Sequence, residues 1–171
     1  LMGYANPVER FGYAEFARAA AEAGVDGLLT VDLPPEEVIQ LKVHLDAHHL
    51  DNIFLLAPTT TVERAQKIAA HATGFLYYVS LKGVTGAGHL DVDAVKKKLA
   101  EFGKLTDLPV CVGFGIKDPD TAKAVAALAD GVVVGSVLVD KMGSMAGHKP
   151  QEIAQAVGQI VGDIRAAIDS L

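Results

Sequence analysis

The sequence has 171 residues, 50% of them hydrophobic, and a formal net charge of -6 from 15 basic and 21 acidic side chains. This size and apolar content suffice for the core of one domain, residues 1–171, whereas the acidic balance disfavours nucleic acid as a partner because nucleic-acid binding needs a concentrated basic surface. No segment approaches the roughly 20 apolar residues that span a bilayer, and the N-terminus has no signal-peptide pattern, so we expect a cytoplasmic protein with no membrane partner.

In the first half of the chain, apolar runs of strand character alternate with amphipathic helical segments. Leu1–Ala5 resembles the end of a strand, and an Asn6-Pro7 turn follows it before the first helix. Two more strands are predicted at Val25–Val31 and Ile53–Ala57. Each of the three helices should bury one face, composed of Tyr13, Phe16, Ala20 and Ala23 in the first, Val38, Leu41 and Leu45 in the second, and Ala65, Ile68 and Ala69 in the third.

Local signals predict where the second and third of these helices begin. The second should open at Pro34-Pro35-Glu36-Glu37, because proline suits the first helical turn and carboxylates suit the positive end of the helix dipole. The third should begin near Thr60, with Glu63 three residues later completing a capping box.

The second half continues the alternation. Strands are predicted at Phe75–Ser80, Pro109–Val112 and Gly131–Val134. Helices are predicted from about Asp91, from Pro119 behind an Asp118 cap, from Val137 to Met142 and from Pro150 to Ile168, with a mobile loop over Met142–Lys149. The inward positions of the first two of these helices are Val92, Val95, Leu99 and Phe102, then Ala122, Val125 and Ala126.

The strands read as continuous apolar runs, which is typical of a parallel sheet covered by helices in an α/β fold. Six strand segments can be counted, whereas a closed (β/α)8 TIM barrel needs eight. The pattern therefore fits either a partial barrel or a complete, open, doubly wound sheet.

Three clusters of small residues follow consecutive strands and together suggest a phosphate cradle. The clusters are Gly83-Val84-Thr85-Gly86, Gly113-Phe114-Gly115 and Gly135-Ser136. Glycine lets an oxyanion approach backbone N–H groups closely, and threonine or serine adds a hydroxyl donor. The expected short helix after Gly135 would also offer its N-terminus to an anion.

Other cofactor and metal patterns are not found in the sequence. The six histidines have no metal-site spacing, and Cys111 lies in an apolar run, where a small buried residue is favoured over a reactive thiol. Residues 83–88 read G-V-T-G-A-G, which is not the G-x-G-x-x-G of a dinucleotide-binding loop, and no P-loop motif occurs. We therefore expect neither a bound metal nor a cofactor.

Candidate acid–base groups are few. Asp32 ends a strand, where it could serve catalysis or cap the following helix, and the two interpretations are equally supported. Tyr4 and Tyr77 lie at strand ends and could pack a flat apolar substrate, although a core role is favoured on the residues alone.

Assembled in this order, the residues closely resemble the tryptophan synthase alpha-subunit family. The resemblance spans nearly the whole chain through the segments Leu1-Met2-Gly3-Tyr4-Ala5-Asn6-Pro7, Gly24-Val25-Asp26-Gly27, Asp32-Leu33-Pro34 with Glu36-Glu37, Gly83-Val84-Thr85-Gly86, Gly113-Phe114-Gly115-Ile116 and Gly135-Ser136. It implies a partial TIM barrel that runs from the end of strand 3 through strand 8. It also implies retro-aldol cleavage of indole-3-glycerol phosphate to indole and glyceraldehyde 3-phosphate in tryptophan biosynthesis.

The resemblance also assigns site residues. The phosphate contacts fall on Gly86, Gly113, Phe114, Gly115, Gly135 and Ser136. The pocket for the indole ring falls on Met2 or Leu1, Tyr4, Val31, Leu55, Tyr77, Thr85 and Val133. Asn6 is counted among the substrate-binding residues, and Asn6 and the region around Pro34 would also meet the beta subunit, which would carry pyridoxal phosphate in the α2β2 complex.

Two departures from the family qualify this assignment. The glutamate and aspartate that serve the family as acid and base would precede Leu1, so the chain alone is expected to be inactive. Leu81-Lys82 replaces a more polar pair ahead of Gly83. A non-catalytic phosphate-binding or partner-binding module and a barrel enzyme for another sugar phosphate are the alternatives.

Overall fold

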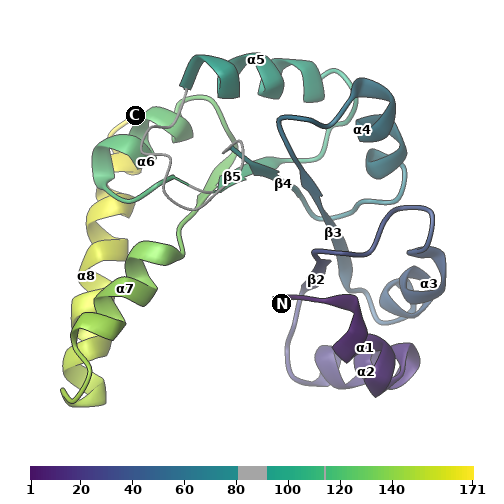
Figure 1. Ribbon diagram of the computed structural model, residues 1–171, viewed down its shortest axis with the longest axis horizontal. Helices are drawn as coiled ribbons and strands as arrows, with labels where there is room; N and C mark the ends of the chain where they lie inside the picture. Colours follow the sequence, from purple (N-terminus) through teal and green to yellow (C-terminus); the bar gives the residue numbers. More distant parts are fainter. Residues whose placement is uncertain (81–91, 114) are drawn as a thin grey trace.

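The six strands form one parallel sheet in chain order, β1 to β6. The computed structural model describes residues 1–80, 92–113 and 115–171. The strands are β1 (Met2–Gly3), β2 (Gly27–Thr30), β3 (Asp51–Leu56), β4 (Leu76–Val79), β5 (Val110–Gly113) and β6 (Gly131–Val133). Figure 1 shows the sheet as an arc with its helices on the convex side. A doubly wound sheet would carry helices on both faces, so the partial TIM barrel is confirmed and the doubly wound alternative is wrong.

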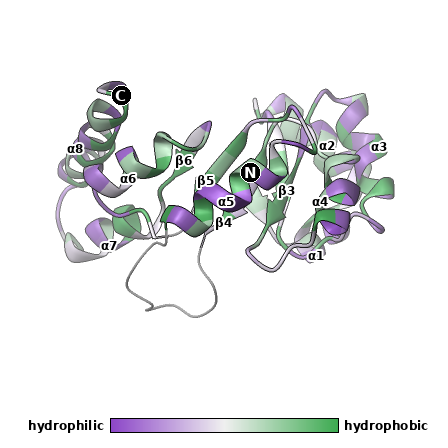
Figure 2. Cartoon of the chain, turned by 90° about the horizontal axis from the view of Figure 1, so that it is seen from above, coloured by the Kyte–Doolittle hydropathy of each residue, from purple (hydrophilic) through white to green (hydrophobic). Residues whose placement is uncertain are grey.

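Eight helices are seen in the described ranges. They are α1 (Ala5–Phe11), α2 (Tyr13–Glu22), α3 (Ile39–Ala47), α4 (Val62–Ala69), α5 (Val92–Phe102), α6 (Pro119–Ala126), α7 (Ser136–Ser144) and α8 (Pro150–Asp169). None of the described helices is long and apolar enough to cross a bilayer. These helices form the outer layer of the arc, and α8, with 20 residues, is the longest of them (Figure 2).

Alternate residues of each strand face two different environments. The larger apolar cluster lies between the sheet and the helices and includes Leu56, Tyr78 and Val112 from the strands with Leu41 and Val125 from the helices. A smaller cluster draws its members from strands and the residues beside them, so it lies on the opposite, concave face of the arc. Its buried members are Leu29, Ile53 and Tyr77, and its partly buried members are Val31, Leu55, Phe75, Val79 and Val133.

Two helix starts agree with capping rules, although one is shifted. Asp118 caps α6 as predicted, accepting a hydrogen bond from the Thr121 backbone N–H at 2.8 Å. The N-cap of α4 is Thr61, and the Thr60 hydroxyl instead accepts from the Ala57 N–H at 2.9 Å. The predicted capping box with Glu63 is therefore wrong, because Glu63 lies only two residues beyond the true cap.

Three other boundaries and one predicted buried position differ from the prediction. Helix α3 begins at Ile39, because Pro34–Glu37 forms a turn closed by a hydrogen bond from the Glu37 N–H to the Pro34 carbonyl. Asn6-Pro7 lies inside α1 and is not a turn before it, since proline fits the first helical turn. Ala23 is exposed at the end of α2. Helix α7 extends through Ser144, so the predicted loop shortens to 145–149.

Candidate functional site

Four residues of the predicted ring pocket lie in one apolar cluster on the concave face. Val31, Leu55, Tyr77 and Val133 all belong to the smaller cluster, although they come from four parts of the chain. The strand register explains this, since Leu55 is paired with Tyr77 and both side chains point to the same face. The sequence reasoning missed four members of this cluster, Leu29, Ile53, Phe75 and Val79, because a continuous apolar run does not show which of its residues face the concave side.

The tyrosine of this cluster packs directly over Gly113, the last residue of β5. Only 7% of Tyr77 is exposed, and a Cβ atom added to Gly113 would lie 2.0 Å from the Tyr77 hydroxyl oxygen. Burial, and then the nearby Cys111 thiol, raise the pKa of Tyr77, so the phenol stays protonated at neutral pH. Gly113 is thus required by the packing of Tyr77, independently of any bound anion.

Cys111 lies beside Tyr77 on the neighbouring strand and behaves as a small apolar residue. Burial, and then the Asp130 carboxylate, raise the pKa of the Cys111 thiol, so it stays protonated and weakly nucleophilic. A Cβ atom on Gly131 would lie 2.9 Å from the Cys111 sulfur. Cys111 therefore occupies the space over this glycine, as Tyr77 does over Gly113.

The predicted phosphate residues within the described ranges lie at the ends of two adjacent strands. Gly113 is paired with Val133 across β5 and β6, and Gly115 follows with a φ of 77°, which a residue with a side chain adopts only at a cost. Gly135 is the N-cap of α7, and Ser136 is its first residue. Because the sheet is parallel, both strand ends lie at the same rim of the arc, the one formed by the carboxyl ends of the strands. Thr85, Gly86 and Phe114 lie outside the described residues.

Helix α7 offers its N-terminus to this rim. The N-cap Gly135 has no side chain to bond the first N–H groups, and its own carbonyl accepts from the N–H groups of Leu138 and Val139 at 2.9 and 3.1 Å. A Cβ atom on Gly135 would meet nothing within 4 Å, so the space above it is open. Open space at the positive end of a helix suits an anion.

Met2, Tyr4 and Asn6 are not brought together with the concave cluster. They lie at the other edge of the sheet, in and after β1, where Met2 is 58% and Tyr4 64% exposed and Asn6 is also exposed on α1. The predicted ring pocket is thus spread over the two edges of the arc, with Val133 at one and Tyr4 at the other.

Asp32 has a structural partner that the sequence did not predict. Its carboxylate accepts a hydrogen bond of 2.7 Å from the Ala5 N–H, the first N–H of α1. Asp32 therefore caps α1, and the prediction that it caps the following helix is wrong. It also lines a groove of about 660 Å³ between α1, α2 and the start of α3, which includes Asn6, Glu36 and Glu37.

The described residues contain no group of three or more His, Cys, Asp or Glu side chains that could hold a metal ion. The candidate site in the described residues consists of a rim of backbone N–H groups with the Ser136 hydroxyl, next to an apolar concave surface. Such a surface can bind a ligand with a phosphate at one end and a flat apolar group at the other.

Comparison with known proteins identifies close relatives. The family profile described as "Tryptophan synthase alpha chain" matches residues 1–168. The alpha chains of Marinobacter nauticus and Thioalkalivibrio sulfidiphilus are 55% and 56% identical over 100% and 99% of this chain. The chain spans 63% of the length of each of these two relatives.

Solved structures agree in fold. The tryptophan synthase alpha subunit of Legionella pneumophila superposes with a TM-score of 0.86 at 41% identity, covering 100% of this chain and 62% of the other. A structure of the tryptophan synthase a2b2 complex from Pyrococcus furiosus gives a TM-score of 0.84 at 33% identity over 97% of this chain and 66% of the other.

Proposed function

This chain belongs to the tryptophan synthase alpha chain family, and from that membership and its strand ends we propose that it forms the substrate-holding part of an alpha subunit. The reaction is retro-aldol cleavage of indole-3-glycerol phosphate to indole and glyceraldehyde 3-phosphate, a lyase step of tryptophan biosynthesis. One observation carries the proposal: the apolar concave cluster and the glycine-rich rim adjoin at the same ends of β4, β5 and β6.

The two ends of the substrate would occupy different parts of this surface. The phosphate would accept hydrogen bonds from backbone N–H groups near Gly115, Gly135 and Ser136, each such charge-assisted bond contributing on the order of 1.5 to 3 kcal/mol. Gly86 and Phe114 complete this set in the proposal. The indole ring would pack on Val31, Leu55, Tyr77 and Val133, with Met2, Tyr4 and Thr85 around it.

The acid–base groups of the reaction would come from outside this stretch. At the carboxyl ends of the described strands, the residues that alternate onto the concave face are apolar, glycine, cysteine or tyrosine, and Tyr77 stays protonated. Asp51 shares this face, but it begins β3 and so lies at the opposite strand end from the glycine-rich rim. Asp32 is engaged with the N-terminus of α1. The 171-residue chain alone is therefore proposed to bind ligand without cleaving it.

The partner would be a tryptophan synthase beta subunit, as in the a2b2 complex of P. furiosus, in the cytoplasm. Asn6 lines the groove of α1, α2 and α3, and Pro34 lines a pocket that shares Asp32 and Leu33 with that groove. Both residues would form part of the contact. No cofactor is assigned to this chain, and pyridoxal phosphate would belong to the beta subunit.

Calorimetry with glycerol 3-phosphate, together with an assay of indole release, tests the proposal. Gly135→Asp should weaken binding roughly ten-fold or more, because the added carboxylate has room at the helix N-terminus and repels the phosphate. The matched control Gly135→Ala adds the same Cβ without the charge and should bind nearly as the native chain does. Equal binding by both variants would refute the phosphate site, and indole release by the chain alone at the rate of a full subunit would refute the external acid and base.

A non-catalytic phosphate-binding or partner-binding module is the second candidate. The apolar character of the concave cluster favours it, because the titratable groups beside the glycine-rich rim are Tyr77 and Cys111, whose raised pKa values make both weak acids. The assay would be repeated with a beta subunit and with the family's acid and base residues supplied. If indole release stayed undetectable, this candidate would be supported over the lyase.

A further inference from the structure

Ser80, the residue after β4, makes two hydrogen bonds to the end of the neighbouring strand. Its N–H donates to the Gly113 carbonyl at 3.1 Å, which continues the ladder between β4 and β5 by one step. Its hydroxyl donates to the same carbonyl oxygen at 2.8 Å. Any residue except proline would supply the first hydrogen bond, whereas the second needs a hydroxyl on a short side chain. The hydroxyl bond is therefore the part of this contact that depends on the residue type.

Gly113 ends β5, so its carbonyl is held where the chain leaves the sheet. The two donors occupy both lone pairs of the carbonyl oxygen, which restricts its rotation. Because a peptide unit is planar, fixing this carbonyl also fixes the direction in which the chain continues towards Gly115. Gly115 is exposed and has a φ of 77°, and only 6% of the next residue, Ile116, is exposed. The Gly115 N–H is thus held between an anchored carbonyl and a buried side chain.

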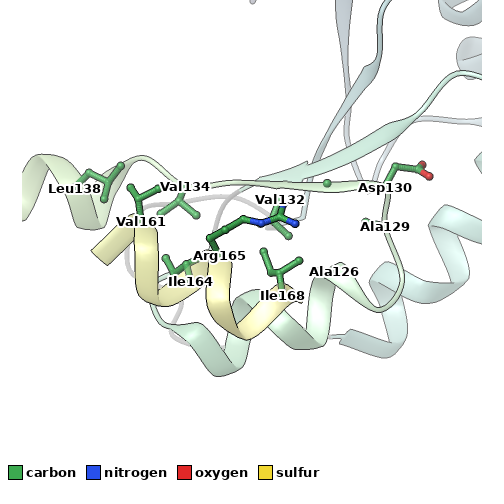
Figure 3. A pocket seen from close by; sticks show the side chains of 11 residues that line it. Ala126, Ala129, Asp130, Val132, Val134, Leu138, Val161, Ile164, Arg165 and Ile168 are labelled. Carbon is green, nitrogen blue, oxygen red and sulfur yellow. The ribbon is translucent and has the colours of Figure 1, made fainter. Parts of the chain in front are cut away.

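The other half of the glycine-rich rim is held by different contacts. Gly135 is the N-cap of α7, and Val134 just before it packs against the larger apolar cluster, which includes Ile164 of α8 (Figure 3). The position of the α7 N-terminus therefore depends on apolar packing, whereas the position of Gly115 depends on the end of β5. Loss of the Ser80 hydroxyl should displace the first half of the rim and leave the second in place.

We propose that Ser80 is a positioning residue for the phosphate end of the ligand. Its hydroxyl holds the Gly113 carbonyl, and through that carbonyl it directs the Gly115 N–H towards the anion. Ser80 acts through the backbone of β5 and does not itself bind the phosphate. The inference rests on the phosphate site proposed above, and it extends the residues on which that site depends from β5 and β6 to the end of β4.

Calorimetric titration of the full 171-residue chain with glycerol 3-phosphate tests this role. Ser80→Ala keeps the backbone hydrogen bond and removes the hydroxyl, and it should weaken binding roughly three- to ten-fold, as expected for the loss of one hydrogen bond. Ser80→Thr keeps a hydroxyl and should bind nearly as the native chain does. The matched control is Ser144→Ala. The Ser144 hydroxyl also donates to a carbonyl at 2.8 Å, that of Lys141, but at the far end of α7, so its loss should leave binding unchanged.

NMR spectra of the chain with isotopically labelled glycine separate positioning from a general loss of stability. Without ligand, Ser80→Ala should shift the amide resonance of Gly115 and leave that of Gly135 in place. Ser80→Thr should restore the Gly115 resonance to its native position. A variant that was merely less stable would keep both resonances of its folded state where they are.

The possible results separate the role of Ser80 from the phosphate site. Weaker binding by Ser80→Ala with a displaced Gly115 resonance, both restored by Ser80→Thr, supports the proposal. Native affinity in Ser80→Ala, an equal loss in Ser144→Ala, or weaker binding with an unmoved Gly115 resonance would overturn the role of Ser80 and leave the phosphate site standing. If the native chain did not bind glycerol 3-phosphate, the phosphate site itself would be refuted, and the role of Ser80 with it.

Discussion

Replacing Gly113 by alanine should force the Tyr77 ring out of its place. The added Cβ would lie 2.0 Å from the Tyr77 hydroxyl oxygen, 2.3 Å from Cζ and 2.7 Å from Cε1. The backbone has little freedom to move away, because the Ser80 hydroxyl and N–H both donate to the Gly113 carbonyl, at 2.8 and 3.1 Å. The strain must therefore be relieved by the ring, which is buried in the concave cluster.

The cost follows from overpacking a buried site. Such substitutions typically destabilise by about 1–3 kcal/mol, which exceeds the gain of about 0.4–1 kcal/mol that a glycine-to-alanine change draws from the unfolded state. In a Tyr77→Leu background the clashing atoms are absent, since leucine ends before Cε1 and Cζ. There Gly113→Ala should become nearly neutral, which gives a coupling free energy of about 1–3 kcal/mol between the two sites.

Urea unfolding followed by circular dichroism measures all four members of this cycle. Gly3→Ala is the matched control, because Gly3 lies in a strand and its Cβ would meet nothing within 4 Å, and it should change the free energy of unfolding by less than about 0.5 kcal/mol. If Gly113→Ala lowered the free energy of unfolding equally in the native and Tyr77→Leu backgrounds, a clash with the Tyr77 ring would not be the cause of the destabilisation.

Three further substitutions test local contacts. His49 follows α3 with a φ of 57°, so His49→Gly should raise the free energy of unfolding by about 1 kcal/mol, while His48→Gly, at a φ of -111°, should not. The Thr121 hydroxyl, and then its N–H, lower the pKa of Asp118, so the stabilisation from Asp118 is complete above the unfolded pKa of about 4 and is lost as the pH falls through the lower folded pKa. Asp118→Ala should therefore cost about 1 kcal/mol at pH 7 and little at pH 2 in a pH series of urea unfolding. Asp32→Ala should speed hydrogen exchange in α1 and lower stability by about 1 kcal/mol.

The sequence predicted the fold well where local signals and the global pattern agree. All six strands fall within or next to their predicted runs, because a buried parallel strand is a continuous apolar segment. The start of α3 was mispredicted for a physical reason. Pro35 disfavours the helical conformation at Pro34, so the two prolines shape a turn and the helix begins only at Ile39.

The site was less predictable from the sequence because its contacts are non-local. A continuous apolar run does not show which residues face the helices and which face the concave side, and so Leu29 and Ile53 were missed. The packing of Tyr77 over Gly113 depends on the register between β4 and β5. This register pairs Val79 with Gly113, and it pairs Tyr77 with Cys111 two residues earlier on each strand. No spacing along the chain contains that information.

The two halves of the proposed ligand site differ in how much of the barrel they need. Gly113, Gly115, Gly135 and Ser136 lie on the adjacent ends of β5 and β6, so the phosphate end is assembled within the arc. The ring end is divided, because Tyr4 and Val133 lie at opposite edges and only closure of the barrel would bring them near each other. We therefore expect glycerol 3-phosphate to bind this chain and the whole M. nauticus alpha chain with similar affinity. An indolyl-propyl phosphate should bind more tightly than glycerol 3-phosphate only to the whole alpha chain, and calorimetry that finds the same gain for the 171-residue chain would show that the concave cluster alone holds the ring.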